Sequence, residues 1–306
     1  MQNRVIQLTD VTLRDGLQSE PLIISTPQKL NLFQSLLSCS YSRLEFTSFS
    51  HPKWIPQLAD SEELCEAVFK SPYFGQTELM AFVPNEKGLE RFLKFPIPWA
   101  SFFTAASETF HQKNVNATID AGLKNLEGMI KRVKSEKRRI RVYISTVFGC
   151  PYEGEIPIST LEKVLNRVVA LEPDEIALSD TIGVASPARV EKVIKKALEF
   201  YPAEKLALHF HNTYGMALSN IAAAISMGIT QFDGATGGIG GCPYAKGASG
   251  NVPTEEIAYF LNRQENSHQI EWDGLGKTIR LLNQLGLTLD SRLASVLKKG
   301  GTLYGI

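Results

Sequence analysis

The chain has 306 residues, of which 43% are hydrophobic and 21% charged, a composition that excludes disorder as its class. Its 32 basic and 32 acidic residues cancel, so no overall charge attracts nucleic acid or an anionic membrane. The N-terminal stretch MQNRVIQLTD lacks the apolar core of a signal peptide, and no run approaches the roughly 18 apolar residues of a membrane span. We expect a cytoplasmic protein that binds neither nucleic acid nor membrane, and the four widely spaced cysteines are expected to be reduced thiols.

Eight short apolar runs, rich in β-branched and aromatic residues, predict strands along the chain. These runs cover residues 4–12, 42–49, 78–83, 99–105, 141–146, 174–179, 205–210 and 230–235. Segments with helical periodicity lie between most of them. Thr26 before Pro27, Asp60 with Glu63 as a capping box, and Ser186 before a proline predict the starts of three helices.

Strands that alternate with helices predict parallel pairing. Eight such units without an interrupting linker favour the α/β class and a closed (β/α)8 TIM barrel over an open sheet. We expect a single domain over residues 1–306, with the barrel over about 5–262 and appended C-terminal helices over about 263–306.

In a barrel of this kind, reactive residues lie at the carboxyl ends of the strands and in the loops that follow. Candidate residues occupy those places at the first, second, sixth and seventh strands, and a long glycine-rich loop follows the eighth. The candidates are Arg14, Asp15, Glu45, Asp180, His209 and His211.

The seventh strand, with the sequence KLALHFH, carries two histidines at its end. The two-residue period of a strand sends Leu206, Leu208 and Phe210 to one face and both His209 and His211 to the other. A lone strand histidine is usually a hydrogen-bonded core residue. Two on one face at the mouth of a barrel favour a shared metal ion.

Neutral imidazoles cannot neutralise a cation, so a carboxylate from another strand end is expected in the same site. Asp15 is the leading candidate, and a turn role before Gly16 is its alternative. Nitrogen and oxygen ligands without a nearby thiolate pair suit Mg²⁺ or Mn²⁺, with zinc less favoured.

Several segments resemble the 3-hydroxy-3-methylglutaryl-CoA lyase family of metal-dependent barrel enzymes. They are TLRDGLQSE, EFTSFSHPKWIPQLAD, GCPYEG, LSDTIGV, HFHNTYG and GGIGGCPYAKGASGN, and the similarity runs from about residue 5 to 262. The last segment is the most specific, because related condensing synthases share the other features without its cysteine loop. The resemblance implies metal-dependent cleavage of 3-hydroxy-3-methylglutaryl-CoA to acetoacetate and acetyl-CoA, a step of leucine catabolism. It also suggests a homodimer.

The resemblance further implies a ligand set of Asp15, His209, His211 and Asn251 for one Mg²⁺ or Mn²⁺ ion. Without the resemblance, Asn251 is predicted to cap the helix that follows it.

Arg14 is expected to face the thioester carbonyl and to stabilise the enolate oxygen as it develops. Asp15 or His209 would accept the hydroxyl proton, and the sequence does not separate them. Cys242, in a glycine-rich loop expected to fold over the substrate, would protonate the enolate carbon.

Weaker roles are expected for four further residues. Glu45 and Asp180 would shape the polar floor and orient their neighbours, and Gln18 and Ser48 would contact the substrate.

Departures from the common lyase pattern leave alternatives open. Thr12 and Leu13 stand where Gly-Pro is usual, Asn212 where Asp is usual, and Pro21 where lysine is frequent. A lyase for a longer-chain 3-hydroxy-3-alkylglutaryl-CoA is therefore one alternative, and a condensing synthase or aldolase of the same superfamily is another. A third alternative makes the basic run at residues 131–141 an RNA or partner patch on an inert barrel, although a solvated surface is the expected role of that run.

Overall fold

Nine strands and the helices between them make up the described part of the computed structural model, which covers residues 5–72, 75–241 and 250–299. The strands are β1 (Val5–Asp10), β2 (Arg43–Ser48), β3 (Glu78–Phe82), β4 (Trp99–Ala105), β5 (Arg139–Ser145), β6 (Glu175–Asp180), β7 (Leu206–Phe210), β8 (Gln231–Gly234) and β9 (Ser267–His268). All eight predicted strands are confirmed, and every strand end lies within two residues of its predicted position.

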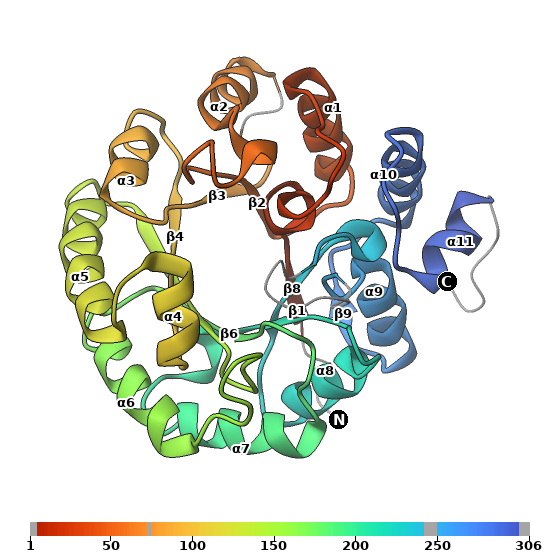
Figure 1. Cartoon of the computed structure of the whole chain (residues 1–306). Helices are drawn as coiled ribbons and strands as arrows, with labels where there is room; N and C mark the ends of the chain where they lie inside the picture. The colour runs from red at the N-terminus through yellow and green to blue at the C-terminus, as the bar shows by residue number, and fades with distance from the viewer. Residues whose placement is uncertain (1–4, 73–74, 242–249, 300–306) are drawn as a thin grey trace.

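The sheet closes on itself. Each of β1 to β8 pairs in parallel with its neighbours in sequence, and β1 completes the ring by pairing with both β8 and β2. Figure 1 looks down this ring, with the helices arranged around it. The predicted (β/α)8 TIM barrel is confirmed.

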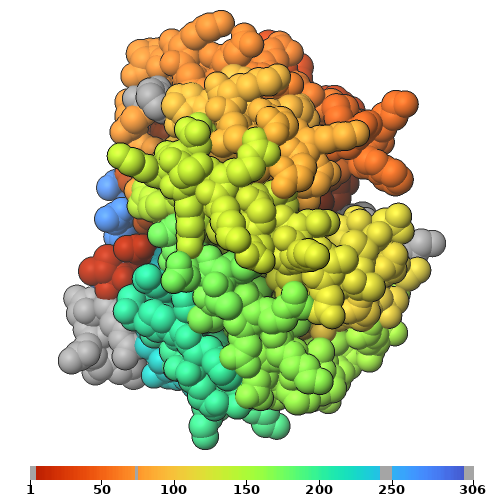
Figure 2. All heavy atoms as spheres, turned by 90° about the vertical axis from the view of Figure 1, so that its left-hand side faces the viewer, coloured from red at the N-terminus to blue at the C-terminus, as the bar shows by residue number. Residues whose placement is uncertain are grey.

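Helices cover the outside of the barrel. Their bounds are α1 (Thr26–Leu37), α2 (Ser61–Lys70), α3 (Glu86–Phe92), α4 (Glu108–Val115), α5 (Ile119–Ser135), α6 (Ile158–Val169), α7 (Pro187–Ala197), α8 (Ala217–Ser226), α9 (Thr254–Arg263), α10 (Trp272–Gln284) and α11 (Arg292–Lys298). Figure 2 shows consecutive units side by side, from orange at the top through yellow and green to cyan at the bottom. None of the described helices has both the length and the apolarity needed to cross a bilayer.

For two of the three predicted helix starts, the capping interaction differs from the prediction. Ser25 rather than Thr26 is the N-cap of α1, and its backbone N–H donates to Gln28 Oε1 at 2.9 Å. Asp60 precedes α2 as predicted, but its side chain makes no capping hydrogen bond. The third prediction is confirmed, because the Ser186 hydroxyl accepts from a backbone N–H in the first turn of α7.

The capping box predicted for Asp60 and Glu63 is wrong for an electrostatic reason. Lys29 is 1% exposed, and its ammonium group lies 2.6 Å from the Asp60 carboxylate. A buried ammonium group needs a counter-charge more than a helix terminus needs a cap, since the backbone N–H groups at that terminus can be satisfied in other ways.

The segment after the barrel packs on its N-terminal units. The two-residue strand β9, which the sequence did not predict, pairs with Val5 and Ile6 of β1. Helix α10 lies against α1, where Thr278 Oγ1 and Ser35 Oγ are 2.8 Å apart. Beyond α10, the backbone N–H of Asp290 donates to the Gly237 carbonyl at 2.9 Å, so the appended segment also supports the start of the glycine-rich loop.

The barrel separates its apolar and polar side chains as the strand period requires. Leu206, Leu208 and Phe210 of β7 belong to the large core between strands and helices. Ala207 belongs instead to a small interior cluster with Tyr143 and Ala177. The predicted inward direction of the histidine face of β7 is therefore confirmed.

Candidate active site

The first site element is a tight turn that follows β1. Residues Thr12–Gly16 form a single π-helical turn, and the Asp10 carboxylate accepts from both the backbone N–H and the hydroxyl of Thr12. A Cβ on Gly16 would lie 2.8 Å from Ile239 Cγ1, so only glycine allows the loops after β1 and β8 to approach this closely. The turn brings Arg14 and Asp15 to the mouth of the barrel.

Arg14 is held between two carboxylates. Its Nε donates to Glu45 Oε2 at 2.5 Å, and its Nη1 donates to Asp15 Oδ1. Burial alone would lower the pKa of Arg14, but Glu45 and Asp15 outweigh burial and raise it above its usual range. Nη2 has no hydrogen-bond partner among the described residues. A permanently charged donor therefore remains available at the site.

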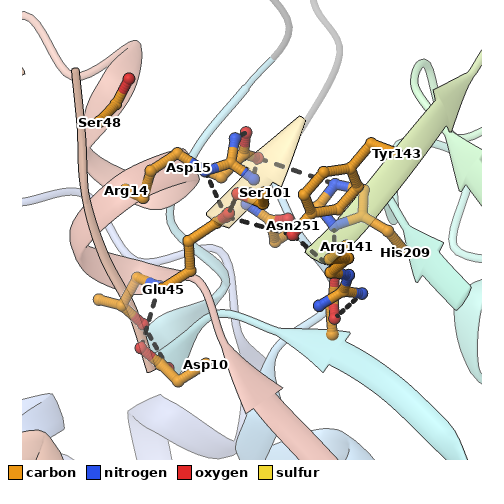
Figure 3. Close-up of polar contacts among 12 residues, drawn as sticks. Asp10, Arg14, Asp15, Glu45, Ser48, Ser101, Arg141, Tyr143, His209 and Asn251 are labelled. Atoms are coloured by element: carbon orange, nitrogen blue, oxygen red, sulfur yellow. Dashed lines mark hydrogen bonds and ion pairs between the residues drawn. The ribbon is translucent and has the colours of Figure 1, made fainter. Parts of the chain in front are cut away.

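Asp15 lies opposite His209 of β7 (Figure 3), and it also faces His211 in the loop that follows. Its Oδ2 is 3.8 Å from His209 Nε2 and 3.5 Å from His211 Nε2. One ligand atom from each residue can be chosen so that all three lie within 4.8 Å of one another. Burial would raise the pKa of Asp15, but the Arg14 guanidinium and the imidazoles hold it well below its usual range. A carboxylate and two imidazoles thus converge on one point.

Asn251 completes this group from the far side of the glycine-rich loop. It forms an isolated bridge with His211, and its Nδ2 donates to Asp15 Oδ2 at 3.0 Å and to the Ile239 carbonyl. Its amide oxygen is buried without a hydrogen-bond partner among the described residues. The N-cap of α9 is Pro253, so the alternative role of Asn251 as a helix cap is wrong.

The donor set fits a divalent cation. It offers two imidazole nitrogens, a carboxylate and an orphaned amide oxygen, and the described part of the site contributes no thiolate. Such nitrogen and oxygen donors suit Mg²⁺, Mn²⁺ or zinc. An unpaired buried amide oxygen is costly, and coordination to a cation would satisfy it.

Glu45 lies on the barrel floor and orients Arg14. Besides the arginine, it accepts hydrogen bonds from the Ser101 hydroxyl and, at 3.2 Å, from the Tyr143 hydroxyl. Its side chain is fully buried. Three donors, one from the turn after β1 and one each from β4 and β5, fix the carboxylate, which in turn fixes the guanidinium.

Asp180 orders the loop after β6. Its two oxygens accept from the backbone N–H groups of Val184 and Ala185, both at 3.0 Å. Burial raises its pKa to about 7. These bonds make the aspartate a loop anchor beside the histidines.

The two predicted substrate contacts lie near the mouth of the barrel. The Ser48 hydroxyl is buried at the end of β2 and is 2.7 Å from the Ser50 hydroxyl. Gln18 is half-buried on the turn after Arg14 and Asp15.

Cys242 lies outside the described residues, but the residues on both sides of its segment border the site. A Cβ on Gly240 would lie 2.7 Å from Asn251 Nδ2 and 3.3 Å from the Asp15 carbonyl. A Cβ on Gly250 would lie 2.4 Å from the Gly238 carbonyl. The glycines therefore allow the two ends of the loop to pack directly on the candidate ligands.

Sequence reasoning missed a layer of polar residues inside the barrel. Asp233 of β8 contacts His209 Nδ1 at 3.1 Å, and Arg141 of β5 donates to Asp233 at 2.6 Å. Tyr143 links this pair to Glu45. Arg141 belongs to the basic run expected to be solvated surface, and that expectation is wrong for this residue, which is fully buried.

The other cations of the run are at least partly exposed, as the surface prediction requires. Lys131 pairs with Glu127, and Arg132 pairs with two glutamates of α3.

Comparison with known proteins identifies the relatives of this barrel. A family model described as HMGL-like matches residues 5–282. Hydroxymethylglutaryl-CoA lyase YngG of Bacillus subtilis is 40% identical over 294 residues, which cover 96% of this chain and 97% of the relative. The mitochondrial hydroxymethylglutaryl-CoA lyase of Macaca fascicularis is 40% identical over 84% of this chain and 78% of its own length.

Solved structures agree with this result. The Bacillus subtilis HMG-CoA lyase has a TM-score of 0.92 at 39% identity and covers 96% of this chain and 98% of its own. An Acinetobacter baumannii HMG-CoA lyase, solved in complex with coenzyme A and 3-methylmalate, has a TM-score of 0.91 at 31% identity and covers 99% of this chain and 98% of its own.

Proposed function

This chain belongs to the HMGL-like family, and from that premise we propose that it is a lyase that cleaves 3-hydroxy-3-methylglutaryl-CoA to acetoacetate and acetyl-CoA. The proposal depends above all on one observation. A buried arginine and a carboxylate–bis-imidazole cluster occupy the mouth of a barrel whose Bacillus subtilis relative, matched over 97% of its length, is a hydroxymethylglutaryl-CoA lyase.

The reaction is a retro-Claisen cleavage with three demands. The tertiary hydroxyl at C3 loses its proton as the C2–C3 bond breaks, and the bonding electrons pass to the enolate of the acetyl thioester. That enolate then takes a proton at C2. The site must therefore accept one proton, stabilise an oxyanion and donate another proton.

Asp15, His209, His211 and Asn251 would hold the divalent cation, which we propose to be Mg²⁺ or Mn²⁺. When bound, the cation supplies Lewis-acid activation of the C3 hydroxyl and an anchor for the substrate carboxylate. The asparagine adds an oxygen donor without adding charge.

Arg14 would stabilise the enolate. Glu45 and Asp15 fix two of its nitrogens, so Nη2 is aimed without conformational freedom and can donate to the thioester oxygen as negative charge develops. Because the guanidinium is preorganised by carboxylates within the protein, little reorganisation is required during the reaction.

Proton transfer needs one acceptor and one donor. Asp15 or His209 would accept the hydroxyl proton, and the thiol of Cys242 would deliver a proton to C2. Glu45 and Asp180 would act through their neighbours, and Gln18 and Ser48 would contact the substrate.

The function is tested by mixing purified protein, Mg²⁺ or Mn²⁺, and 3-hydroxy-3-methylglutaryl-CoA, and measuring acetoacetate. Acetoacetate formation supports the proposal. Cleavage of a longer-chain analogue alone would assign a different acyl group, and condensation of acetyl-CoA with a 2-oxo acid would select the synthase alternative.

Three further proposals rest on the similarity of this chain to its relatives. We infer a cytoplasmic location, a place in leucine catabolism, and a homodimer, which sedimentation equilibrium would detect.

A further inference from the structure

A column of alternating charges runs through the barrel interior and ends on His209. Arg43 donates to Glu175 Oε1 at 3.0 Å, and the same oxygen is 3.0 Å from Arg141 Nε. Arg141 Nη2 then donates to Asp233 Oδ1 at 2.6 Å. None of these four side chains is more than 7% exposed. Burying charges this deeply costs desolvation free energy even when they are paired, so a contribution to stability does not by itself explain the column.

Asp233, the last member of the column, determines which ring nitrogen of His209 carries the hydrogen. Asp233 Oδ2 lies 3.1 Å from His209 Nδ1. Its other oxygen accepts from the permanently charged Arg141 at 2.6 Å, and this buried ion pair keeps the carboxylate ionised. An ionised carboxylate can only accept hydrogen bonds, so Nδ1 must carry the hydrogen.

The consequence appears at the other ring nitrogen. In a neutral imidazole with Nδ1 protonated, Nε2 carries a lone pair, and this atom faces Asp15 Oδ2 at 3.8 Å. Two acceptors then face each other, an arrangement that favours a cation between them. The Tyr143 ring packs against the imidazole at 5.9 Å between centroids and restricts its rotation (Figure 3).

We propose that Asp233 is a positioning residue that fixes the tautomer and orientation of His209, so that Nε2 is presented to the cation, and that Arg141 holds Asp233 in place for this task. The inference rests on the proposed metal site. Outer carboxylates of this kind typically contribute about 10- to 100-fold to metal affinity or activity.

The decisive measurement is Mn²⁺ affinity, read from the electron paramagnetic resonance of free Mn²⁺ during titration of the metal-free protein. Asp233→Asn should weaken binding by about 10- to 100-fold. Glu175→Gln is the matched control, because it removes one negative charge from the same column and the same arginine but has no hydrogen bond or ion pair to His209. Its Mn²⁺ affinity should stay within about threefold of the parent chain, well inside that 10-fold limit.

A second measurement does not depend on the folding of any variant. Nitrogen NMR of the unsubstituted, metal-free protein, at a pH above the usual imidazole pKa, should show His209 protonated at Nδ1 and unprotonated at Nε2. The His209 resonances can be assigned by comparison with His209→Gln. Protonation at Nε2 instead would overturn the inference.

The remaining outcomes separate this inference from the proposed function. Unchanged Mn²⁺ affinity in Asp233→Asn, or equal weakening in Glu175→Gln, would also overturn it. If the protein binds Mn²⁺ with the predicted dependence on Asp233 but forms no acetoacetate, the positioning role stands and the proposed reaction fails.

Discussion

Replacing Arg14 by lysine isolates the geometry of the guanidinium from its charge. In the structure, Nε and Nη1 are held by Glu45 and Asp15, and no described residue accepts a hydrogen bond from Nη2. A lysine ammonium group is a point charge on a flexible stem, and it cannot contact both carboxylates and the thioester oxygen in the same directions. Arg14→Lys therefore keeps the positive charge and loses the aimed donor.

The expected cost follows from that loss. Removing one preorganised oxyanion donor lowers kcat by roughly 10²- to 10³-fold, which corresponds to about 3–4 kcal/mol. Because Glu45 keeps a positive partner in Arg14→Lys, the free energy of unfolding should change little.

Arg14→Gln is the comparison variant. It leaves the fully buried Glu45 carboxylate without its cation, and breaking a buried pair in this way costs about 3–5 kcal/mol. The thermal midpoint should fall by roughly 5–8 °C, because the entropy of unfolding of a chain of this length is about 0.6 kcal/mol/K. Its kcat loss should equal or exceed that of the lysine variant.

The assays are steady-state kinetics with 3-hydroxy-3-methylglutaryl-CoA, thermal unfolding followed by circular dichroism, and Mn²⁺ titration of each variant. A kcat for Arg14→Lys within about fivefold of the parent chain, far from the 10²-fold expectation, would refute the assigned donor geometry. A glutamine variant as stable as the parent would show that Glu45 is not paired as described.

Other consequences can be checked with simpler measurements. Cys242→Ser should slow turnover sharply, because a hydroxyl is a much weaker acid than a thiol, while elemental analysis finds unchanged metal content; normal turnover would remove the cysteine from the mechanism. Asn251→Ala should weaken Mn²⁺ binding by at least roughly 10-fold, and calorimetry that detects no change would exclude the amide as a ligand. Burial raises the pKa of Glu255 from 4.5 to about 7, so the folded chain keeps a proton that the unfolded chain loses, and the contribution of this residue to stability falls as the pH rises between those values. The thermal midpoint of Glu255→Gln, measured relative to that of the parent, should therefore be higher at about pH 8 than at about pH 5. A difference in midpoint that does not change with pH would contradict the raised pKa.

The barrel was predictable because its signals are local. Each strand is a short apolar run between turn residues, and the alternation with helices leaves few topologies open. The two-residue strand β9 gave no such signal, since two residues have no measurable period. The capping prediction for α2 was wrong for a different reason. Asp60 pairs with Lys29, which is 31 positions away in sequence.

The inward histidines were predictable from the period of β7, and the same rule could have found part of the polar layer. In β5, Ile140, Val142 and Ile144 belong to the outer core, so Arg141 and Tyr143 must face inward. The basic run obscured this pattern, because its neighbouring cations are in the solvent-exposed part of α5.

The strand period also separates the two carboxylates nearest His209. Asp180 and Asp233 each lie near the carboxyl end of a strand next to β7. Asp180 has the period of Ile176 and Leu178, which belong to the outer core, and it accepts from backbone N–H groups of its own loop. Asp233 follows the outer-core residue Phe232, so it faces inward, where it contacts His209. The pairing itself depends on the register between β7 and β8, which no local pattern gives. The strand period thus determines which side chains face the interior, and the register between strands determines which of them become partners.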